Sequence, residues 1–172
     1  VVVFTGSGRA FSAGDDISGR PMGDCEAQQL VPNIPAGHNH PTGTYNGLRG
    51  LSQPVNIAIR NLDKLSIAAM NGVAIQTGFS LALACDFRIA STEARMGSAT
   101  LRFGLLPDEG GQYLLVQMMG VAKTMDFLMR KRIVSAQEAL ELGLVHEVVA
   151  PTELMTRTME FARELANGPQ VA

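Results

Sequence analysis

Short apolar runs constrain the fold of this chain more than any other feature. Val1–Thr5 is an uninterrupted apolar and β-branched run, and Ser66–Met70 is a second one that ends at an Asn-Gly turn pair. Such runs are typical of strands that are buried on both faces. Two further strand-like runs follow, at Phe87–Ala90 and Val145–Val149. The sequence therefore predicts a sheet whose strands lie inside the protein.

Segments with helical spacing of apolar residues alternate with these strands. Pro54 should kink the first of them or mark the restart of its helix. Ser135 and Glu138 have the spacing of an N-terminal capping box. The predicted helices are Tyr45–Leu62, Thr77–Cys85, Gly110–Met119, Ala122–Arg130, Ser135–Leu142 and Thr152–Ala166. Alternating strands and helices indicate an α/β fold with a largely parallel sheet.

Two segments are predicted to be irregular. Gly6–Asp16 is a glycine-punctuated loop that follows the first strand. Ser18–Thr42 is rich in proline and glycine, and it should contain at most one short helix, at Glu26–Leu30. A loop of this length in a compact domain is either functional or disordered. No motif within Gly19–Thr42 identifies a substrate.

The composition favours one globular domain and disfavours several other classes of protein. The chain has 172 residues, of which 46% are apolar and only 17% are charged, so a partner subunit is expected to cover part of its surface. The net charge is −2 and no basic run is present, which argues against nucleic-acid binding. No apolar run approaches the ~20 residues that a membrane-spanning helix needs. Cys25 and Cys85 are expected to be reduced thiols, as is typical of cytoplasmic proteins.

Five segments form a distinctive set when they are taken in order and with their spacing. They are Gly8–Ile17, Ile67–Ala74, Leu81–Ala90, Gly104–Gly111 and Ile133–Val145. Together they resemble the crotonase (enoyl-CoA hydratase/isomerase) superfamily. The resemblance implies a single crotonase-like domain over residues 1–172, built as a spiral of ββα units. It also implies that the family's N-terminal strands and C-terminal helices lie beyond this piece, which alone should be weakly stable. The intact protein is expected to be a homo-trimer or a dimer of trimers.

The resemblance implies a site for an acyl-CoA thioester. Two backbone N–H groups that point at one carbonyl oxygen would stabilise an enolate, the anion formed when a carbon next to a thioester loses a proton. The crotonase pattern assigns these N–H groups to Ala13, beside the permissive Gly14, and to Thr77, at the start of a helix. The family usually has Gly in place of Thr77, whose branch is expected to crowd the thioester. The alternative is that Gly6–Asp16 is only a tight turn.

Further contacts with the substrate follow from the same resemblance. In the family, the backbone of the segment at Asp15 and Asp16 wraps the CoA adenine, so binding there is expected through the main chain. The residues expected to bind substrate are Ser12, Gly14, Asp15, Asp16, Ile17, Gly78, Ser80 and Thr100. No metal or redox cofactor is implied, because coenzyme A enters as part of the substrate.

The acid/base group is where this chain departs from the hydratases of the family. Those enzymes use two glutamates, and the matching positions hold Ser80 and Thr100, whose hydroxyls cannot act as carboxylate bases near neutral pH. Asp108 matches the catalytic aspartate of dienoyl-CoA isomerases and of ring-opening isomerases, so the resemblance assigns the proton shuttle to Asp108. The alternative is an ordinary N-cap. Glu109 is a weaker second choice, more typical of a first-turn charge that favours the helix dipole.

The remaining polar candidates favour structural roles. His38 and His40 have no third ligand near them in the sequence, so a mobile surface pair is favoured over a metal site. His146 is expected to be structural, and Asp86 is expected to hydrogen-bond to nearby backbone.

The sequence thus predicts an enzyme that binds an acyl-CoA and shifts the double bond of an enoyl-CoA through a thioester enolate. One alternative is an enoyl-CoA hydratase or a CoA-thioester C–C hydrolase of the same fold. Another is a non-catalytic relative that only binds acyl-CoA. No nucleic acid or membrane is expected as a partner, and the expected location is the cytoplasm.

Overall fold

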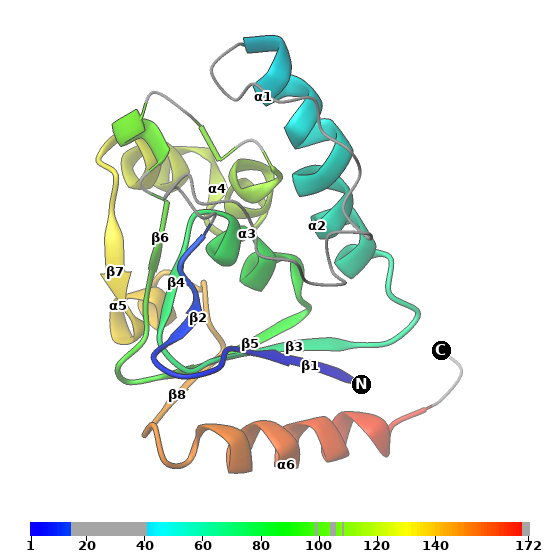
Figure 1. Ribbon diagram of the computed structural model, residues 1–172. Helices are drawn as coiled ribbons and strands as arrows, with labels where there is room; N and C mark the ends of the chain where they lie inside the picture. Colours follow the sequence, from blue (N-terminus) through cyan, green and yellow to red (C-terminus); the bar gives the residue numbers. More distant parts are fainter. Residues whose placement is uncertain (15–40, 99, 104–105, 108, 170–172) are drawn as a thin grey trace.

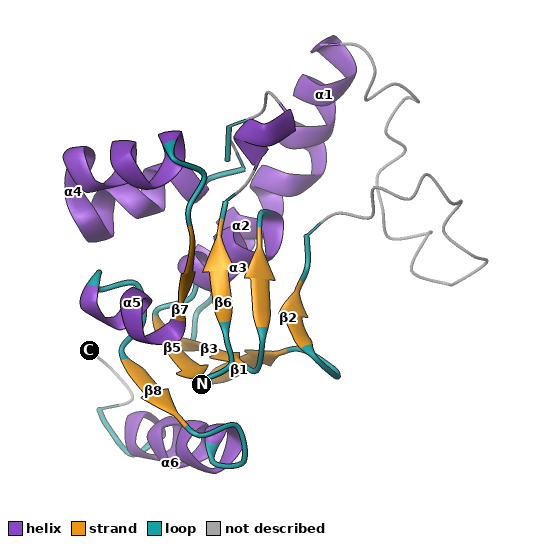
Figure 2. Ribbon diagram, turned by 90° about the vertical axis from the view of Figure 1, so that its left-hand side faces the viewer, coloured by secondary structure: helices purple, strands orange, loops and turns teal. Residues whose placement is uncertain are grey.

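Two four-stranded sheets frame the fold in the computed structural model, which describes residues 1–14, 41–98, 100–103, 106–107 and 109–169. The first sheet has the order β1 (Val2–Thr5), β3 (Ser66–Met70), β5 (Phe87–Ser91), β8 (Glu147–Val149), and all its neighbours are parallel. The second has the order β2 (Ala10–Ser12), β4 (Val73–Ile75), β6 (Arg95–Gly97), β7 (Ile133–Ser135), and only β7 is antiparallel to its neighbour. The strands of one sheet run across those of the other (Figure 2). The predicted α/β fold with a largely parallel sheet is confirmed.

The chain repeats one unit, in which a strand of the first sheet leads into a strand of the second and then into a helix. The clearest copies are β3–β4–α3, with α3 at Thr77–Ala84, and β5–β6–α4, with α4 at Gly111–Met129. The chain then adds β7, α5 (Ala136–Glu141), β8 and α6 (Leu154–Ala166). This order of elements matches the predicted spiral of ββα units.

The burial of β3 explains why its sequence is apolar throughout. Ile67 and Ala69 belong to a core cluster that includes Leu154 of α6, whereas Ala68 and Met70 belong to the larger core on the opposite side of the sheet. Both faces of β3 are therefore covered, and α6 lies along one of them (Figure 1). The larger core joins the two sheets to helices α3 and α4.

The first residues differ from prediction in two respects. The strand predicted at Val1–Thr5 forms as β1, with Val3 on one core cluster and Phe4 on the other, but it is only partly buried because it lies at the edge of its sheet and pairs with β3 alone. The predicted loop Gly6–Asp16 contains a strand, β2, because Ala10 and Ser12 pair with β4. That pairing joins segments more than 60 residues apart in the chain, and no local pattern signals it.

The predicted breaks in the long helices are confirmed. The first helical segment runs as α1 (Pro41–Gly47), a π-helical turn at Leu48–Ser52 and α2 (Gln53–Arg60), so the irregularity expected at Pro54 is a π-helical turn just before it. Gly120 interrupts α4 with a φ of 76° and a ψ of 168°. A glycine adopts this conformation without the steric penalty of a side chain.

Several predictions fall outside the described residues. They concern the irregular segment from Ser18 to His40, the short helix Glu26–Leu30 and the His38–His40 pair. Among the helices of the described part, none is long and apolar enough to cross a membrane. The same residues contain no group of three His, Cys, Asp or Glu side chains that could hold a metal ion.

Candidate active site

The segment Ser12–Gly14 meets the start of α3. Gly14 has a φ of 89°, and a Cβ atom on it would lie 3.1 Å from the Ile75 carbonyl oxygen and 3.2 Å from the Gln76 Cβ. A Cβ atom on Gly78 would lie 2.5 Å from the Ser12 Cβ and from the Ser12 carbonyl oxygen. These contacts flank Ala13 and Thr77, the two predicted oxyanion donors. The fold therefore brings the backbones of Ala13 and Thr77 to the same place.

An unusual backbone conformation starts α3. Gln76 has a φ of 58° and a ψ of −122°, and a positive φ is uncommon for a residue with a side chain. Two hydrogen bonds hold it there. The Gln76 N–H donates to the Gly97 carbonyl of β6 at 3.1 Å, and the Gln76 carbonyl accepts from the Ser80 N–H at 3.0 Å. The abrupt turn lets a helix begin at Thr77 directly beside β2 and β4.

Two buried hydroxyls occupy the positions where the hydratases of the resemblance carry glutamates. Ser80 is 1% exposed, and its hydroxyl donates to the Glu109 carboxylate at 2.9 Å. The Thr100 and Ser98 hydroxyl oxygens lie 2.9 Å apart and share a hydrogen bond. Ser80 and Thr100 therefore each have a buried hydroxyl that is hydrogen-bonded to another side chain.

The surroundings of Glu109 differ from the prediction. Glu109 was expected to be a first-turn charge, but it precedes both the N-cap Gly110 and the first helical residue Gly111, and it is only 5% exposed. Its backbone carbonyl accepts a hydrogen bond from the Asn56 side chain at 3.0 Å. The prediction of a first-turn charge is wrong because α4 begins only at Gly111, and the Glu109 carboxylate turns inward to Ser80. The sequence did not identify Asn56 as a site residue. The one local indication is that this amide lies on the same buried face of α2 as Ile59.

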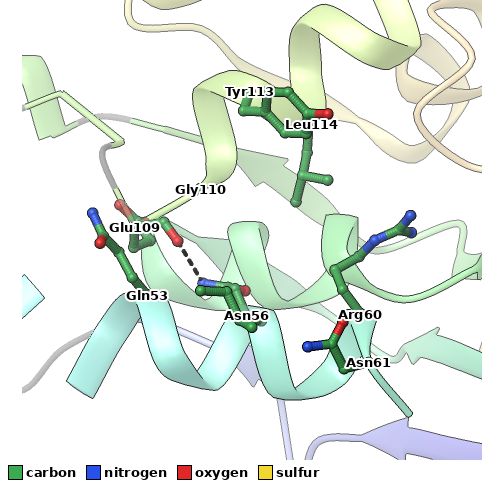
Figure 3. Close-up of a pocket in the computed structure, with 9 residues that line it drawn as sticks. Gln53, Asn56, Arg60, Asn61, Glu109, Gly110, Tyr113 and Leu114 are labelled. Atoms are coloured by element: carbon green, nitrogen blue, oxygen red, sulfur yellow. Dashed lines mark hydrogen bonds between the residues drawn. The ribbon is translucent and has the colours of Figure 1, made fainter. Parts of the chain in front are cut away.

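A cavity of about 350 Å³ lies between α2 and the start of α4. It is lined by Gln53, Asn56 and Arg60 of α2 and by Glu109, Tyr113 and Leu114 on the opposite side (Figure 3). Figure 3 shows the hydrogen bond from Asn56 to the Glu109 carbonyl, which joins two of the lining residues. Polar groups from both walls thus line one open cavity, as is common in ligand sites.

A buried arginine supports the far end of α3. The Arg88 guanidinium donates to the Cys85 carbonyl at 2.6 Å and to the Leu144 carbonyl at 2.7 Å, with longer bonds to two further carbonyls of α3. Burial lowers the pKa of Arg88 to about 10, so the group stays charged at neutral pH. A cation here complements the negative end of the helix dipole.

The other predicted polar residues have structural roles. The Asp86 carboxylate accepts from the Ser66 N–H and hydroxyl, both at 2.8 Å, which ties the end of α3 to β3. His146 Nδ1 accepts the Arg88 N–H at 3.1 Å, and burial lowers the pKa of His146. Cys85 is a free buried thiol, as predicted, and burial raises its pKa to about 11.

Four predicted site residues lie outside the described residues. They are Asp15, Asp16 and Ile17, expected to bind substrate, and Asp108, expected to shuttle the proton. Their assignments remain predictions from the sequence.

The fold and this site define a class: an α/β spiral in which a glycine-rich segment meets the start of a short buried helix. Residues 1–172 match the model of the enoyl-CoA hydratase/isomerase family, and the chain belongs to that family, the crotonase superfamily.

Relatives of known sequence and structure agree with this. The chain is 34% identical to a carnitinyl-CoA dehydratase of Escherichia coli K12 over 173 aligned positions, which are 100% of this chain and 59% of the relative. An enoyl-CoA hydratase from Bacillus anthracis has a TM-score of 0.81 and 29% identity, over 98% of this chain and 59% of that one. A monofunctional enoyl-CoA isomerase from M. smegmatis has a TM-score of 0.71 and 30% identity, over 99% of this chain and 64% of that one. The chain thus spans less than two thirds of the length of these relatives.

Proposed function

We propose that the protein moves a proton through a thioester enolate and so shifts the carbon–carbon double bond of an enoyl-CoA. The observation that carries this proposal is the contact between Ser12–Gly14 and the start of α3. This contact supports the assignment of the oxyanion to the Ala13 and Thr77 N–H groups. Two preorganised donors of this kind stabilise the charge that develops on the thioester oxygen as the carbon loses its proton.

The choice of isomerisation over hydration rests on Ser80 and Thr100. An isomerase needs one group that takes a proton from one carbon and returns it to another. Hydration also needs a water to be deprotonated, for which the related hydratases use two carboxylates. The hydroxyls at these positions cannot do this near neutral pH. We assign the proton shuttle to Asp108, the residue that the family pattern indicates, with the neighbouring Glu109 as the second candidate.

Water addition or removal across the same pair of carbons is the second candidate. The specific observation in its favour is the 34% identity to a carnitinyl-CoA dehydratase. Both reactions pass through the same enolate, so both use the same oxyanion donors. The acyl-CoA thioester is the proposed partner in either case, with Asp15, Asp16 and Ile17 at its CoA portion. A homo-trimer or a dimer of trimers is the proposed assembly.

One experiment separates these reactions. The protein is incubated with a 3-enoyl-CoA and, separately, with crotonyl-CoA, and the products are followed by absorbance and mass. We expect the 3-enoyl-CoA to become a conjugated 2-enoyl-CoA of unchanged mass. Faster addition of one water to crotonyl-CoA would favour the second candidate. Binding with no reaction would identify a non-catalytic relative.

The oxyanion assignment has its own matched pair of variants. Thr77 is the first residue of α3, a position where proline fits because its missing N–H has no acceptor within the helix. Thr77→Pro should therefore keep the helix but lower turnover by roughly 100-fold or more, the cost of losing one oxyanion donor. Thr77→Ala keeps the N–H and should retain turnover within a few-fold. Equal turnover in both variants would contradict the assignment.

A further inference from the structure

Glu109 combines burial and anchoring in a way that is unusual for a glutamate. It is 5% exposed, and glutamate is among the residues most rarely buried unless it is paired. The Ser80 hydroxyl donates to its Oε1 at 2.9 Å, and this bond joins residues 29 positions apart in the chain. Burial together with a specific partner is the environment in which proton-transferring carboxylates are found.

The backbone of Glu109 is held from the opposite side. Asn56 Nδ2 donates to the Glu109 carbonyl at 3.0 Å and to the Ser52 carbonyl at 3.2 Å. The Glu109 backbone is thus fixed by α2, while its carboxylate is fixed by α3. Figure 3 shows this carbonyl facing α2, on the wall of the cavity of about 350 Å³.

A glycine allows the close approach of Glu109 to α3. A Cβ atom on Gly111 would lie 2.3 Å from the Ser80 Oγ, closer than Cβ atoms approach other atoms, so a larger residue there would have to displace the Ser80 hydroxyl. Ser80 lies three residues after Thr77, within the first turn of α3, and its N–H donates to the Gln76 carbonyl. One helical turn rises ~5.4 Å, so the anchor of the carboxylate lies close to the proposed oxyanion donor.

We propose that Glu109 is the carboxylate that moves the proton, and that Ser80 is its positioning residue; the inference rests on the proposed function. The Glu109 carboxylate takes a proton from the substrate carbon, and the electron pair of that C–H bond forms the enolate. It then returns the proton to the other end of the conjugated system, and the double bond shifts. No further reactant is needed. Asn56 keeps the Glu109 backbone in register during both steps.

The test compares conservative variants of the full protein. Glu109→Gln keeps the size and the hydrogen-bond acceptor for Ser80 but cannot take up the proton. We expect isomerisation of a 3-enoyl-CoA to fall by at least ~100-fold, with the dissociation constant for the CoA ester and the melting temperature close to those of the parent. Glu147→Gln, on β8, is the matched control and should keep full turnover, because Glu147 pairs with Arg157 instead. Glu109→Asp keeps the charge but has a shorter side chain. Its turnover should lie between those of Glu109→Gln and Glu147→Gln.

The positioning role of Ser80 is tested by comparing the effects of Ser80→Ala on kcat and on KM. Ser80→Ala should lower kcat by roughly 10-fold while KM stays within two-fold, because the substrate is still bound but the carboxylate is no longer oriented. A packing defect alone would instead lower the melting temperature and leave kcat unchanged. Unchanged kcat in this variant would overturn the positioning role.

A second readout separates this inference from the proposed function. Exchange of the α-protons of a saturated acyl-CoA with D2O, followed by NMR, reports proton transfer without any double-bond shift. A parent protein that exchanges but does not isomerise would overturn the proposed reaction, while loss of exchange in Glu109→Gln would still support Glu109. Parent-like turnover and exchange in Glu109→Gln, with both lost in Asp108→Asn, would overturn the assignment to Glu109. A parent that does neither would overturn both proposals.

Discussion

Gly78 of α3 lies so close to Ser12 of β2 that a Cβ atom on it would come within 2.5 Å of the Ser12 carbonyl oxygen. Gly78 follows Thr77 and Ser12 precedes Ala13, so this contact sets the spacing of the two proposed oxyanion donors. Only a residue without a side chain allows that spacing.

Gly78→Ala should therefore separate β2 from α3. Alanine favours helices, yet here the added methyl group must push back the Ser12 backbone, which should destabilise the fold by roughly 1–3 kcal/mol. Because a misplacement of ~1 Å can cost about 100-fold in rate, turnover should fall more steeply than stability. Urea unfolding and enoyl-CoA turnover measure the two effects.

Gly50→Ala is the matched control for this variant. A Cβ atom on Gly50 would meet no atom within 4 Å. We expect its unfolding free energy to equal or exceed that of the parent, since alanine is the better helix former. A Gly78→Ala protein as stable and active as the Gly50→Ala protein would show that β2 and α3 tolerate separation.

Arg88→Met should destabilise the fold more than most exchanges of an arginine. The variant leaves buried carbonyls of Cys85 and Leu144 without their donor. Each unsatisfied buried group costs ~1–3 kcal/mol, so a loss of roughly 2–4 kcal/mol in the free energy of unfolding is expected. Arg95→Met, at an exposed position of β6, should change it by less than ~0.5 kcal/mol. Equal denaturation midpoints for the two variants would refute the role of Arg88.

Cys85 should be inert in the folded protein. Its raised pKa of about 11 leaves only about a thousandth of the thiol ionised at pH 8, and burial blocks access to it. In a Cys25→Ser background, where Cys85 is the single thiol, a thiol reagent should label the native protein far more slowly than the urea-unfolded one. Rapid labelling of the native protein at pH 8 would mean that the end of α3 opens readily.

His146 should make the fold less stable as the pH falls below ~6.5, the ordinary pKa of histidine. Burial and the Arg88 charge lower the pKa of His146 in the folded state, so the unfolded chain binds a proton first as the pH drops. The free energy of unfolding then decreases from that pH down to the lowered pKa, and levels off below it.

His146→Asn isolates this effect. The Asn Oδ1 can accept the Arg88 N–H as Nδ1 does, but it does not titrate. Between pH 7 and pH 5 the parent should lose more stability than the variant, as measured by urea unfolding at each pH. Parallel curves for the two proteins would exclude His146 as the source of the pH dependence.

The sequence alone determined the elements whose signals are local. The apolar run Ser66–Met70 predicts a strand, and single residues predict the break at Gly120 and the irregularity beside Pro54. Ser135 caps α5 as predicted, accepting from the Glu138 N–H at 3.2 Å. Only half of that capping box forms, since the Glu138 carboxylate pairs with Arg132. Family-specific segments also identified Ala13 and Thr77 as a pair, and the fold brings their backbones together.

The tertiary structure decided whatever depends on residues far apart in the chain. The pairing of β2 with β4, the positive φ of Gln76 and the burial of Glu109 have no local signal, because each is stabilised by a distant partner. Glu109 is the clearest case, since its hydrogen bonds reach across 29 residues to Ser80 and across 53 residues to Asn56. Its sequence neighbours suggested a charge in the first turn of a helix. Contacts with two other helices turn the carboxylate inward, and such contacts exist only once the chain is folded.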